Sequence, residues 1–457
     1  TTISHGRGKD IKLLREMHFP HSLGLLYSAF TYYCGFKINS GEYKLMGLAP
    51  YGTAGSARVK EFKEKILREL IDLKEDGSLF LNMSYFTFAT TLRTVDDKKW
   101  SALFDLPPRP QESLITEPYM DLALAIQEIT DEVMVRLART AKKLTGVNNL
   151  VMAGGVALNC VANEKIVDAN IFENVWVQPA AGDAGGALGA ALAAHHIYFG
   201  QERIIDPSVP DSMQGSYLGP QYSGIDIERM AQKYGATYKR YDVFQSLATD
   251  VASYMKNGAV IGWMQGRMEW GPRALGNRSI LADARNPEMQ KKLNLKIKYR
   301  EGFRPFAPSV LEEDAKEYFE TKIPSPYMLF TAPVKKDRRK PVAPATLPLA
   351  DRLYTLRSDI PSITHLDYSA RLQTVSKKTN ERYWNLINSF KEQTGYGVIV
   401  NTSFNVRGEP IVMTPEDAYR CFMQTEIDYL VIGDYLFDKK DQPVWEKLSV
   451  EKTYGLD

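Results

Sequence analysis

The stretch NLVMAGGVALN, residues 149–159, decides the fold class. Its apolar run at 150–152 predicts a short buried strand, and Gly154 and Gly155 predict a turn. From Ala157 onward the pattern is typical of a helix. A strand that runs through a glycine turn into a helix is the repeating unit of α/β proteins.

The same pattern returns at once in NVWVQPAAGDAGGALGAALAAH, residues 174–195. It predicts a strand at Val175–Val177, a loop that holds Asp183, and an alanine-rich helix. Before both units, apolar residues recur at helical spacing over Asp121–Leu144, and Gly146 stands where a C-terminal cap belongs. This part of the chain therefore predicts an α/β layer.

Elsewhere the patterns are shorter. Leu23–Tyr33 predicts a buried helix or strand, Glu42–Thr53 a turn-rich loop, and Pro333–Leu353 an exposed excursion rich in charges and prolines. Thr1–Asp10 has no apolar pattern that would start an element. In the second half we expect helices over Ile225–Tyr234, Val243–Lys256 and Pro415–Met423, and strands over Ala259–Gln265, Val398–Val400 and Tyr429–Ile432.

Composition and charge limit the possible classes of function. The chain has 457 residues, of which 44% are hydrophobic and 25% charged, as in ordinary globular proteins of several domains. A net charge of +2 gives no general affinity for polyanions. Three cysteines without a CxxC pair indicate a reducing, cytoplasmic location. No apolar run is long enough to suggest a membrane span.

The positive charge is concentrated in residues 261–310. This segment has net charge +6, and the rest of the chain has −4. Its cations stand among glycine and proline motifs, which favours a pocket for phosphate groups. A solvated basic face and a nucleic-acid surface remain open alternatives. The ten cations are Arg267, Arg273, Arg278, Arg285, Lys291, Lys292, Lys296, Lys298, Arg300 and Arg304.

Three further motifs each allow two interpretations. The polar run NTSFNVRGEP, residues 401–410, follows a strand, where open α/β sheets bind ligands, but it could equally be a local turn. The Gly154–Gly155 turn before Asn159 would let a nucleotide approach the backbone, and helix packing explains it equally well. Asp183 could bind a metal or cap a helix.

Taken together, the motifs resemble those of the O-carbamoyltransferase family, which includes enzymes of nodulation and of cephamycin and tobramycin biosynthesis. The resemblance runs in order over nearly the whole chain. It is carried by EYKLMGLAPYG, MAGGVALN, GDAGGALGAA, MQGRMEWGPRALGNRSILAD, LNLKIKYREGFRPFAPSV and NTSFNVRGEPIV.

The resemblance implies an α/β chain of two joined domains. Residues 1–205 would be part of a TsaD-like carbamoyl-transfer domain of the actin-like ATPase type, without its N-terminal part. Residues 206–221 would be a linker, and residues 222–457 a YrdC-like domain that forms carbamoyl-adenylate. The family uses carbamoyl phosphate and ATP with Mg²⁺, and transfers the carbamoyl group to a hydroxyl of a small molecule or natural product.

The resemblance also implies roles for individual residues. Lys298, Arg273, Arg304 and Ser403 match catalytic positions of the YrdC-like site, where Arg371, Asn401, Asn405 and Arg407 would join them in binding carbamoyl phosphate and ATP. In the first domain, Gly154, Gly155 and Asn159 match the nucleotide side, and Asp183 matches a metal ligand, with iron or another divalent metal expected.

One departure affects the first domain. The family's phosphate loop, catalytic histidine and HxxxH pair do not occur in this sequence, so we expect that this chain alone does not complete carbamoyl transfer. A tRNA threonylcarbamoyl-transfer fusion and a nucleic-acid-binding module are the alternatives. We expect small-molecule partners and neither nucleic acid nor a membrane, and a homodimer is an open alternative for the assembly.

Overall fold

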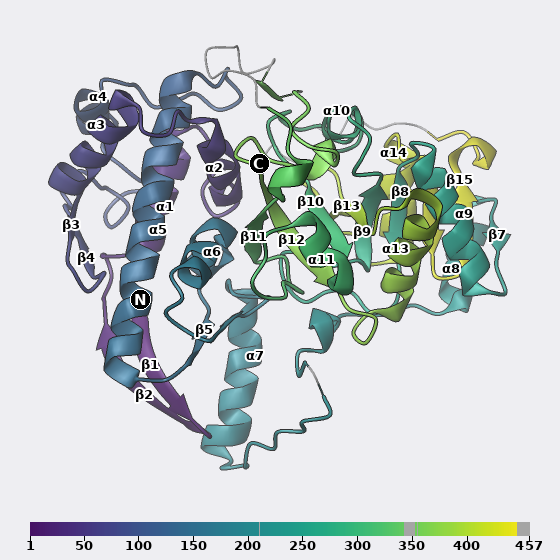
Figure 1. The fold of residues 1–457 in the computed structure, drawn as a ribbon, viewed down its shortest axis with the longest axis horizontal. Helices are drawn as coiled ribbons and strands as arrows, with labels where there is room; N and C mark the ends of the chain where they lie inside the picture. Colours follow the sequence, from purple (N-terminus) through teal and green to yellow (C-terminus); the bar gives the residue numbers. More distant parts are fainter. Residues whose placement is uncertain (210, 342–351, 354, 446–457) are drawn as a thin grey trace. The chain divides into compact units, whose positions relative to one another are not determined.

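The computed structural model describes residues 1–209, 211–341, 352–353 and 355–445. The chain divides into two compact units, Thr1–Ser208 and Val209–Leu456, and each is described by itself (Figure 1). Within the described ranges, no helix combines the length and the apolarity needed to cross a membrane.

The first unit is built on one long helix, α5 (Glu117–Thr145), which Figure 1 shows running through the length of this unit. Its positions Leu122, Ile126 and Ile129 recur at helical spacing and are 0% exposed. Gly146 ends the helix in the left-handed conformation, with φ of 67°, and donates to Lys142 O. The predicted helix and its glycine cap are confirmed.

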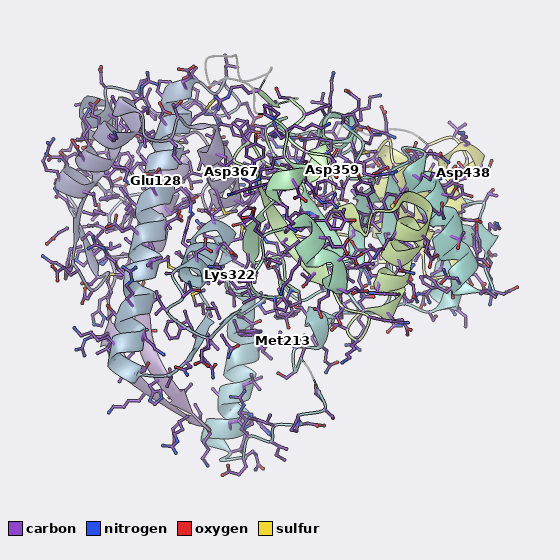
Figure 2. The ribbon with its side chains drawn as sticks, viewed as in Figure 1. Glu128, Met213, Lys322, Asp359, Asp367 and Asp438 are labelled. Carbon is purple, nitrogen blue, oxygen red and sulfur yellow. The ribbon has the colours of Figure 1, made fainter. Side chains whose placement is uncertain are left out.

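Two shorter helices, α1 (Leu23–Tyr33) and α3 (Ala57–Lys65), pack against α5. Lys63 Nζ lies 2.8 Å from Glu128 Oε2, which ties α3 to α5; Glu128 is labelled in Figure 2. Phe30 of α1 is fully buried. The segment predicted as a helix or a strand is therefore a helix.

The strand–turn–helix repeat is also confirmed, but the prediction that the strand at 150–152 is buried is wrong, since Val151 is 72% exposed. Strands β5 (Asn149–Met152) and β6 (Asn174–Val177) pair in parallel. A 3₁₀ turn, η3 (Gly155–Leu158), and helix α6 (Cys160–Asp168) follow β5, and α7 (Ala184–Ala193) follows β6. No residue of α7 is buried.

Two predictions for the first unit are wrong. The expected loop at 42–53 contains helix α2 (Glu42–Leu48), because Leu45 and Leu48 are 0% exposed and their packing outweighs the turn signal of the nearby glycine and proline. The N-terminus forms an antiparallel hairpin of β1 (Thr2–Arg7) and β2 (Asp10–Glu16), whose mostly exposed residues leave no apolar pattern. The other elements of this unit are η1 (Ala49–Tyr51), η2 (Ile66–Leu70), β3 (Ile71–Leu73), β4 (Leu79–Leu81), α4 (Asp97–Phe104) and η4 (Ala194–Tyr198).

The second unit contains a nine-stranded mixed sheet with the order β11-β12-β10-β13-β9-β8-β14-β15-β7. Only the pairs β10–β12 and β8–β14 are parallel. The strands are β7 (Lys239–Arg240), β8 (Ile261–Met264), β9 (Arg278–Ala282), β10 (Ala307–Leu311), β11 (Phe330–Pro333), β12 (Ser369–Val375), β13 (Val398–Ser403), β14 (Tyr429–Ile432) and β15 (Tyr435–Asp438).

Helices cover both faces of this sheet. Helices α9 (Phe244–Lys256) and α13 (Glu381–Thr394) supply the apolar cluster on one face, and α8 (Gly224–Tyr234) and α14 (Pro415–Gln424) supply the cluster on the other. The three helices predicted here are confirmed, with ends that differ by one residue. The remaining short elements are η5 (Gln214–Ser216), α10 (Met289–Lys292), η6 (Leu293–Ile297), η7 (Glu312–Asp314), α11 (Ala315–Tyr318), η8 (Lys336–Arg338), η9 (Pro361–Ile363) and η10 (Lys439–Asp441).

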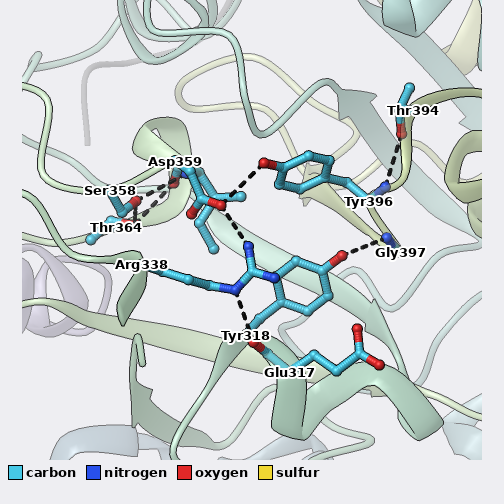
Figure 3. Close-up of polar contacts among 10 residues, drawn as sticks. Glu317, Tyr318, Arg338, Ser358, Asp359, Thr364, Thr394, Tyr396 and Gly397 are labelled. Atoms are coloured by element: carbon cyan, nitrogen blue, oxygen red, sulfur yellow. Dashed lines mark hydrogen bonds and ion pairs between the residues drawn. The ribbon is translucent and has the colours of Figure 1, made fainter. Parts of the chain in front are cut away.

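The segment 333–353, predicted as an exposed excursion, is anchored at both ends. Val334 is 0% exposed and Leu353 is 8% exposed. Arg338 is held in a polar network that Figure 3 shows. The prediction is wrong for these anchored ends, and residues 342–351 lie outside the described part of the chain.

Candidate functional site

The ammonium group of Lys298 lies at the end of strand β13. Lys298 follows η6 directly and is 3% exposed. Its Nζ donates to four oxygens: Ser403 O, Ser403 Oγ at 3.2 Å, Asn405 O at 2.9 Å and Asn405 Oδ1 at 2.9 Å. Ser403 Oγ in turn donates to Asn405 Oδ1 at 2.6 Å. The structure thus brings together three residues that were predicted for one site.

The charges around Lys298 are mostly positive. Burial lowers the pKa of Lys298 well below its usual value, and the nearby cations Arg300 and Arg304 lower it further. The acids Cys421 and Glu409 only partly oppose this shift. A buried ammonium beside two guanidinium groups is stabilised by any anion that binds among them, because the anion offsets their repulsion.

Arg304 and Arg407 share one carboxylate. Glu301 lies 3.7 Å from a guanidinium nitrogen of Arg304 and 3.8 Å from one of Arg407. Their side chains are only 12% and 7% exposed. Both contacts are longer than an ideal ion-pair hydrogen bond, so Glu301 balances two cations at a distance. These two predicted residues therefore lie together, within the segments that hold Lys298 and Asn405.

Strands β12, β10 and β13 contribute a buried polar group beside this site. Asn401 Nδ2 donates to Gln373 Oε1 at 2.8 Å and to Ser309 Oγ at 3.0 Å, and Asn401 is 0% exposed. Arg371 stands two residues before Gln373 on β12, so the two share a face of the sheet. Asn401 and Ser403 share a face of β13 in the same way. The observed hydrogen bonds of Asn401 thus join β13 to its neighbours β10 and β12.

Arg273 stands on the loop between β8 and β9, and its neighbour in the sequence is tied to β13. Asn401 Nδ2 donates to Ala274 O at 3.2 Å. The second arginine of this motif, Arg278, is 0% exposed and donates to carbonyl oxygens of Gln265 at 2.7 Å and Pro220 at 3.1 Å. Arg278 therefore holds the loop, while Arg273 is half-buried nearer its tip.

Several other cations of the basic segment are paired with acids. Arg285 lies 2.7 Å from Asp283, Lys292 lies 2.9 Å from Asp428, and Lys296 lies 3.3 Å from Glu426. Two of these three acids belong to the segment that follows α14, so folding neutralises charge that is unbalanced in the local sequence. This pairing reduces the local excess of positive charge that the sequence shows.

In the first unit, the glycine turn after β5 leaves open space. Gly154 has φ of 103°, and a Cβ atom at Gly154 or Gly155 would meet no described atom within 4 Å. The φ of Gly154 favours glycine whatever its surroundings, whereas packing within the unit does not require Gly155, which leaves the ligand interpretation open. Asn159 is 8% exposed; it accepts from Ala162 N at 3.1 Å and donates to Gln127 at 3.1 Å. Its observed contacts cap α6 and join it to α5.

Asp183 is exposed at the start of α7 and makes no side-chain capping bond there. Over the described ranges, no three His, Cys, Asp or Glu side chains come together as a metal site would require. The residues present thus supply one carboxylate and no ligand set. Iron at Asp183 stays a prediction.

Sequence reasoning missed three supporting residues: Glu269, Ser309 and Gln373. Glu269 stands four residues before Arg273, and Gln373 stands two residues after Arg371 on the same strand. The alternation of a strand could have indicated Gln373. The contact of Ser309 with the site follows only from the order of the strands in the sheet.

Comparisons with known proteins match both halves of the chain. The family model described as "Carbamoyltransferase N-terminus" matches residues 2–192, and that described as "Carbamoyltransferase C-terminus" matches residues 252–439.

Three relatives illustrate the range of similarity. An uncharacterized protein of Synechocystis is 53% identical over 98% of this chain, and nodulation protein NolNO of Sinorhizobium fredii is 37% identical over 97%. The 3'-hydroxymethylcephem-O-carbamoyltransferase of Streptomyces clavuligerus is 30% identical over 68%. The alignments span 72%, 60% and 53% of these relatives, so the chain matches between half and three quarters of their lengths.

Proposed function

Since this chain belongs to the carbamoyltransferase family and is a carbamoyltransferase, we propose that it uses ATP and carbamoyl phosphate to carbamoylate a hydroxyl group of a small molecule or natural product. The name of the Streptomyces relative supports an oxygen acceptor. We further propose that the first unit is TsaD-like and that the second is YrdC-like and forms carbamoyl-adenylate.

The proposed reaction has three steps. Water cleaves carbamoyl phosphate to carbamate and inorganic phosphate. A carbamate oxygen then attacks the α-phosphorus of ATP, which is bound with Mg²⁺, and the bond to pyrophosphate breaks. In the complete reaction, an acceptor hydroxyl then attacks the carbamoyl carbon of the adenylate, AMP leaves, and the hydroxyl proton passes to solvent. We expect this chain alone to perform only the first two steps, because the family's catalytic histidine and HxxxH pair do not occur in it.

The observation that carries this proposal is the cationic group at the end of β13. Lys298 is buried there, its pKa is depressed by burial and by two arginines, and Arg304 and Arg407 both lie beside the carboxylate of Glu301. Carbamoyl phosphate and ATP bring several negative charges to one place, and preorganised cations offset their repulsion. Arg273 and Arg371 extend the group from the adjoining loop and strand.

The test is to incubate the chain with ATP, Mg²⁺ and carbamoyl phosphate and to look for carbamoyl-AMP by mass spectrometry. We expect product from the parent chain and a loss of at least roughly 100-fold in Lys298→Ala and Arg273→Ala, as for other removed charge-stabilising groups. Lys296→Ala is the matched control, because Lys296 stands two residues away in an exposed ion pair.

Unchanged product in both site variants, with their unfolding temperatures kept, would refute the site. Product that requires bicarbonate and threonine in place of carbamoyl phosphate would instead favour the tRNA threonylcarbamoyl-transfer alternative. Both outcomes are read from the same mass spectra.

A further inference from the structure

The loop between β8 and β9, residues 265–277, is far longer than a tight hairpin turn. Loops of this length need contacts of their own to keep one conformation. This loop pairs with the chain before α8: Met268 N donates to Pro220 O at 3.0 Å, and Gly219 N donates to Met268 O at 2.9 Å. The first half of the loop is therefore fixed by backbone bonds.

A single carboxylate fixes the second half. Glu269 Oε1 accepts from the backbone N–H groups of Leu275 at 2.7 Å, Asn277 at 2.8 Å and Arg278 at 3.2 Å. Glu269 is 6% exposed. Hydrogen bonds to an ionised acceptor are about twice as strong as neutral ones. This one buried oxygen thus holds three backbone N–H groups close together and so fixes the second half of the loop.

Side chains from the sheet and from the chain before α8 hold the carbonyls of the same stretch. Leu275 O accepts from Tyr217 Oη at 2.8 Å and from Gln373 Nε2 at 2.8 Å. Ala274 O accepts from Asn401 at 3.2 Å. In the backbone immediately after Arg273, both N–H groups and carbonyl groups therefore have hydrogen-bond partners.

Close packing adds to this hold. Gly276 has φ of 108°, and a Cβ atom there would lie 2.2 Å from the ring of Tyr383. The other end of the held stretch meets the predicted site, because Arg278 O accepts from Phe404 N at 2.9 Å, directly after Ser403. Few conformations of residues 274–278 satisfy all these contacts, and Arg273 is attached to the first of them.

We propose that Glu269 is a positioning residue: its carboxylate fixes the backbone of residues 275–278 and so presents Arg273 to the phosphate groups bound beside Lys298 and Ser403. This inference rests on the proposed function, since it places Arg273 in that site. The three hydrogen bonds that Glu269 accepts come from the backbone of its own loop and of the first residue of β9. A fixed guanidinium stabilises a transferring phosphate more than a mobile one, because it needs no reorganisation.

The first measurement is hydrogen exchange in Glu269→Gln, which needs no activity. The amide oxygen of glutamine is a weaker, neutral acceptor, so we expect the peptide covering 265–282 to exchange roughly tenfold faster. Asp417→Asn is the matched control: Asp417 also accepts backbone N–H groups, at 3.0 Å from Thr414 and 3.3 Å from Met413, but on α14. The control should leave that peptide unchanged.

The second measurement is a double-mutant cycle on the formation of carbamoyl-AMP. We expect Glu269→Gln to raise the KM for the anionic substrates roughly tenfold, and to have no further effect once Arg273→Ala is present, since Glu269 acts through Arg273. A purely structural role would lower the amount of active protein and leave KM unchanged. Glu269→Asp replaces Glu269→Gln if the latter fails to fold.

Additive effects of the two substitutions, or an exchange rate equal to that of the parent chain, would overturn the inference. If the parent chain makes no carbamoyl-AMP, the proposed function fails, and the same cycle is then run on the affinity for pyrophosphate by calorimetry. A parent chain that binds no pyrophosphate overturns the positioning role as well.

Discussion

Lys298 is a buried cation whose neighbours include further cations. Its four oxygen contacts exceed the three protons that an ammonium can donate, so at least one proton is shared between two oxygens. An arriving phosphate can take one of these bonds without leaving the ammonium unsatisfied. The charge of Lys298, rather than a single contact, is therefore the property that the site depends on.

This charge predicts a pH dependence. Burial and the two neighbouring arginines lower the pKa of Lys298, so its proton is lost at a pH below that of a free lysine. As pH rises through this lowered pKa, kcat/KM for the formation of carbamoyl-AMP should fall. In Lys298→Arg the fall should move to higher pH, because a guanidinium stays charged. An alkaline limb at the same pH in both chains would contradict this assignment.

At the scale of elements, long periodic helices and short apolar strands could be predicted from the sequence. β14 has the predicted bounds, Tyr429–Ile432, and α5 extends the predicted helix by a few residues at its start. Helix α2 could not be predicted, since its glycine and the proline that follows it indicate a turn, and only tertiary burial of Leu45 and Leu48 stabilises a helix. The order of the strands in the sheet could not be predicted either, because it depends on pairings between segments that are distant in the sequence.

The arrangement of the candidate site could not be predicted from local sequence either. Lys298 and Ser403 are 105 positions apart in sequence, and family resemblance alone predicted that they meet. The support from Glu269 and Gln373 follows from the path of the loop and from the adjacency of β12, β10 and β13. No local pattern contains that information.

The network around Arg338 anchors the segment after β11, as Figure 3 shows. Arg338 Nη1 lies 2.5 Å from Asp359 Oδ2, its Nε donates to Glu317 O at 2.8 Å, and its guanidinium lies 4.3 Å from the ring centre of Tyr318. Tyr396 Oη donates to the same Asp359 oxygen at 3.2 Å. The mostly buried side chain of Arg338 thus makes an ion pair, a hydrogen bond to a backbone carbonyl and a cation–π contact.

Arg338→Ala should lower the free energy of unfolding by about 1–3 kcal/mol, because it removes a partly buried ion pair and its hydrogen bonds together. The measurement is denaturant unfolding of the whole chain. Lys239→Ala is the control: Lys239 forms an exposed pair with Asp250, at 63% and 40% exposure, which we expect to contribute little. Equal effects of the two substitutions would contradict the anchoring role.

At the scale of the whole molecule, each unit has its own organisation. The two apolar clusters that cover the sheet consist of residues from 222 to 445, and none of their described members comes from the first unit. A unit that buries its own core satisfies the main requirement for folding alone. The two family models divide the chain in the same sense, with one match in each half.

A fragment that starts at Val209 should therefore unfold cooperatively and form carbamoyl-AMP at a rate close to that of the whole chain. Circular dichroism during thermal unfolding and mass spectrometry of the product measure the two properties. A folded fragment that makes no product, while the whole chain does, would show that the first unit is needed for the adenylation step.

The empty space above Gly155 has a consequence for comparing variants of this protein. Nothing described lies within 4 Å of the position where a side chain at 155 would start. Variants that differ at residue 155 can have the same packed core and still differ in the ligands that fit beside this turn. A substitution at residue 155 should therefore change which molecules bind at this turn more than it changes the packing of the core.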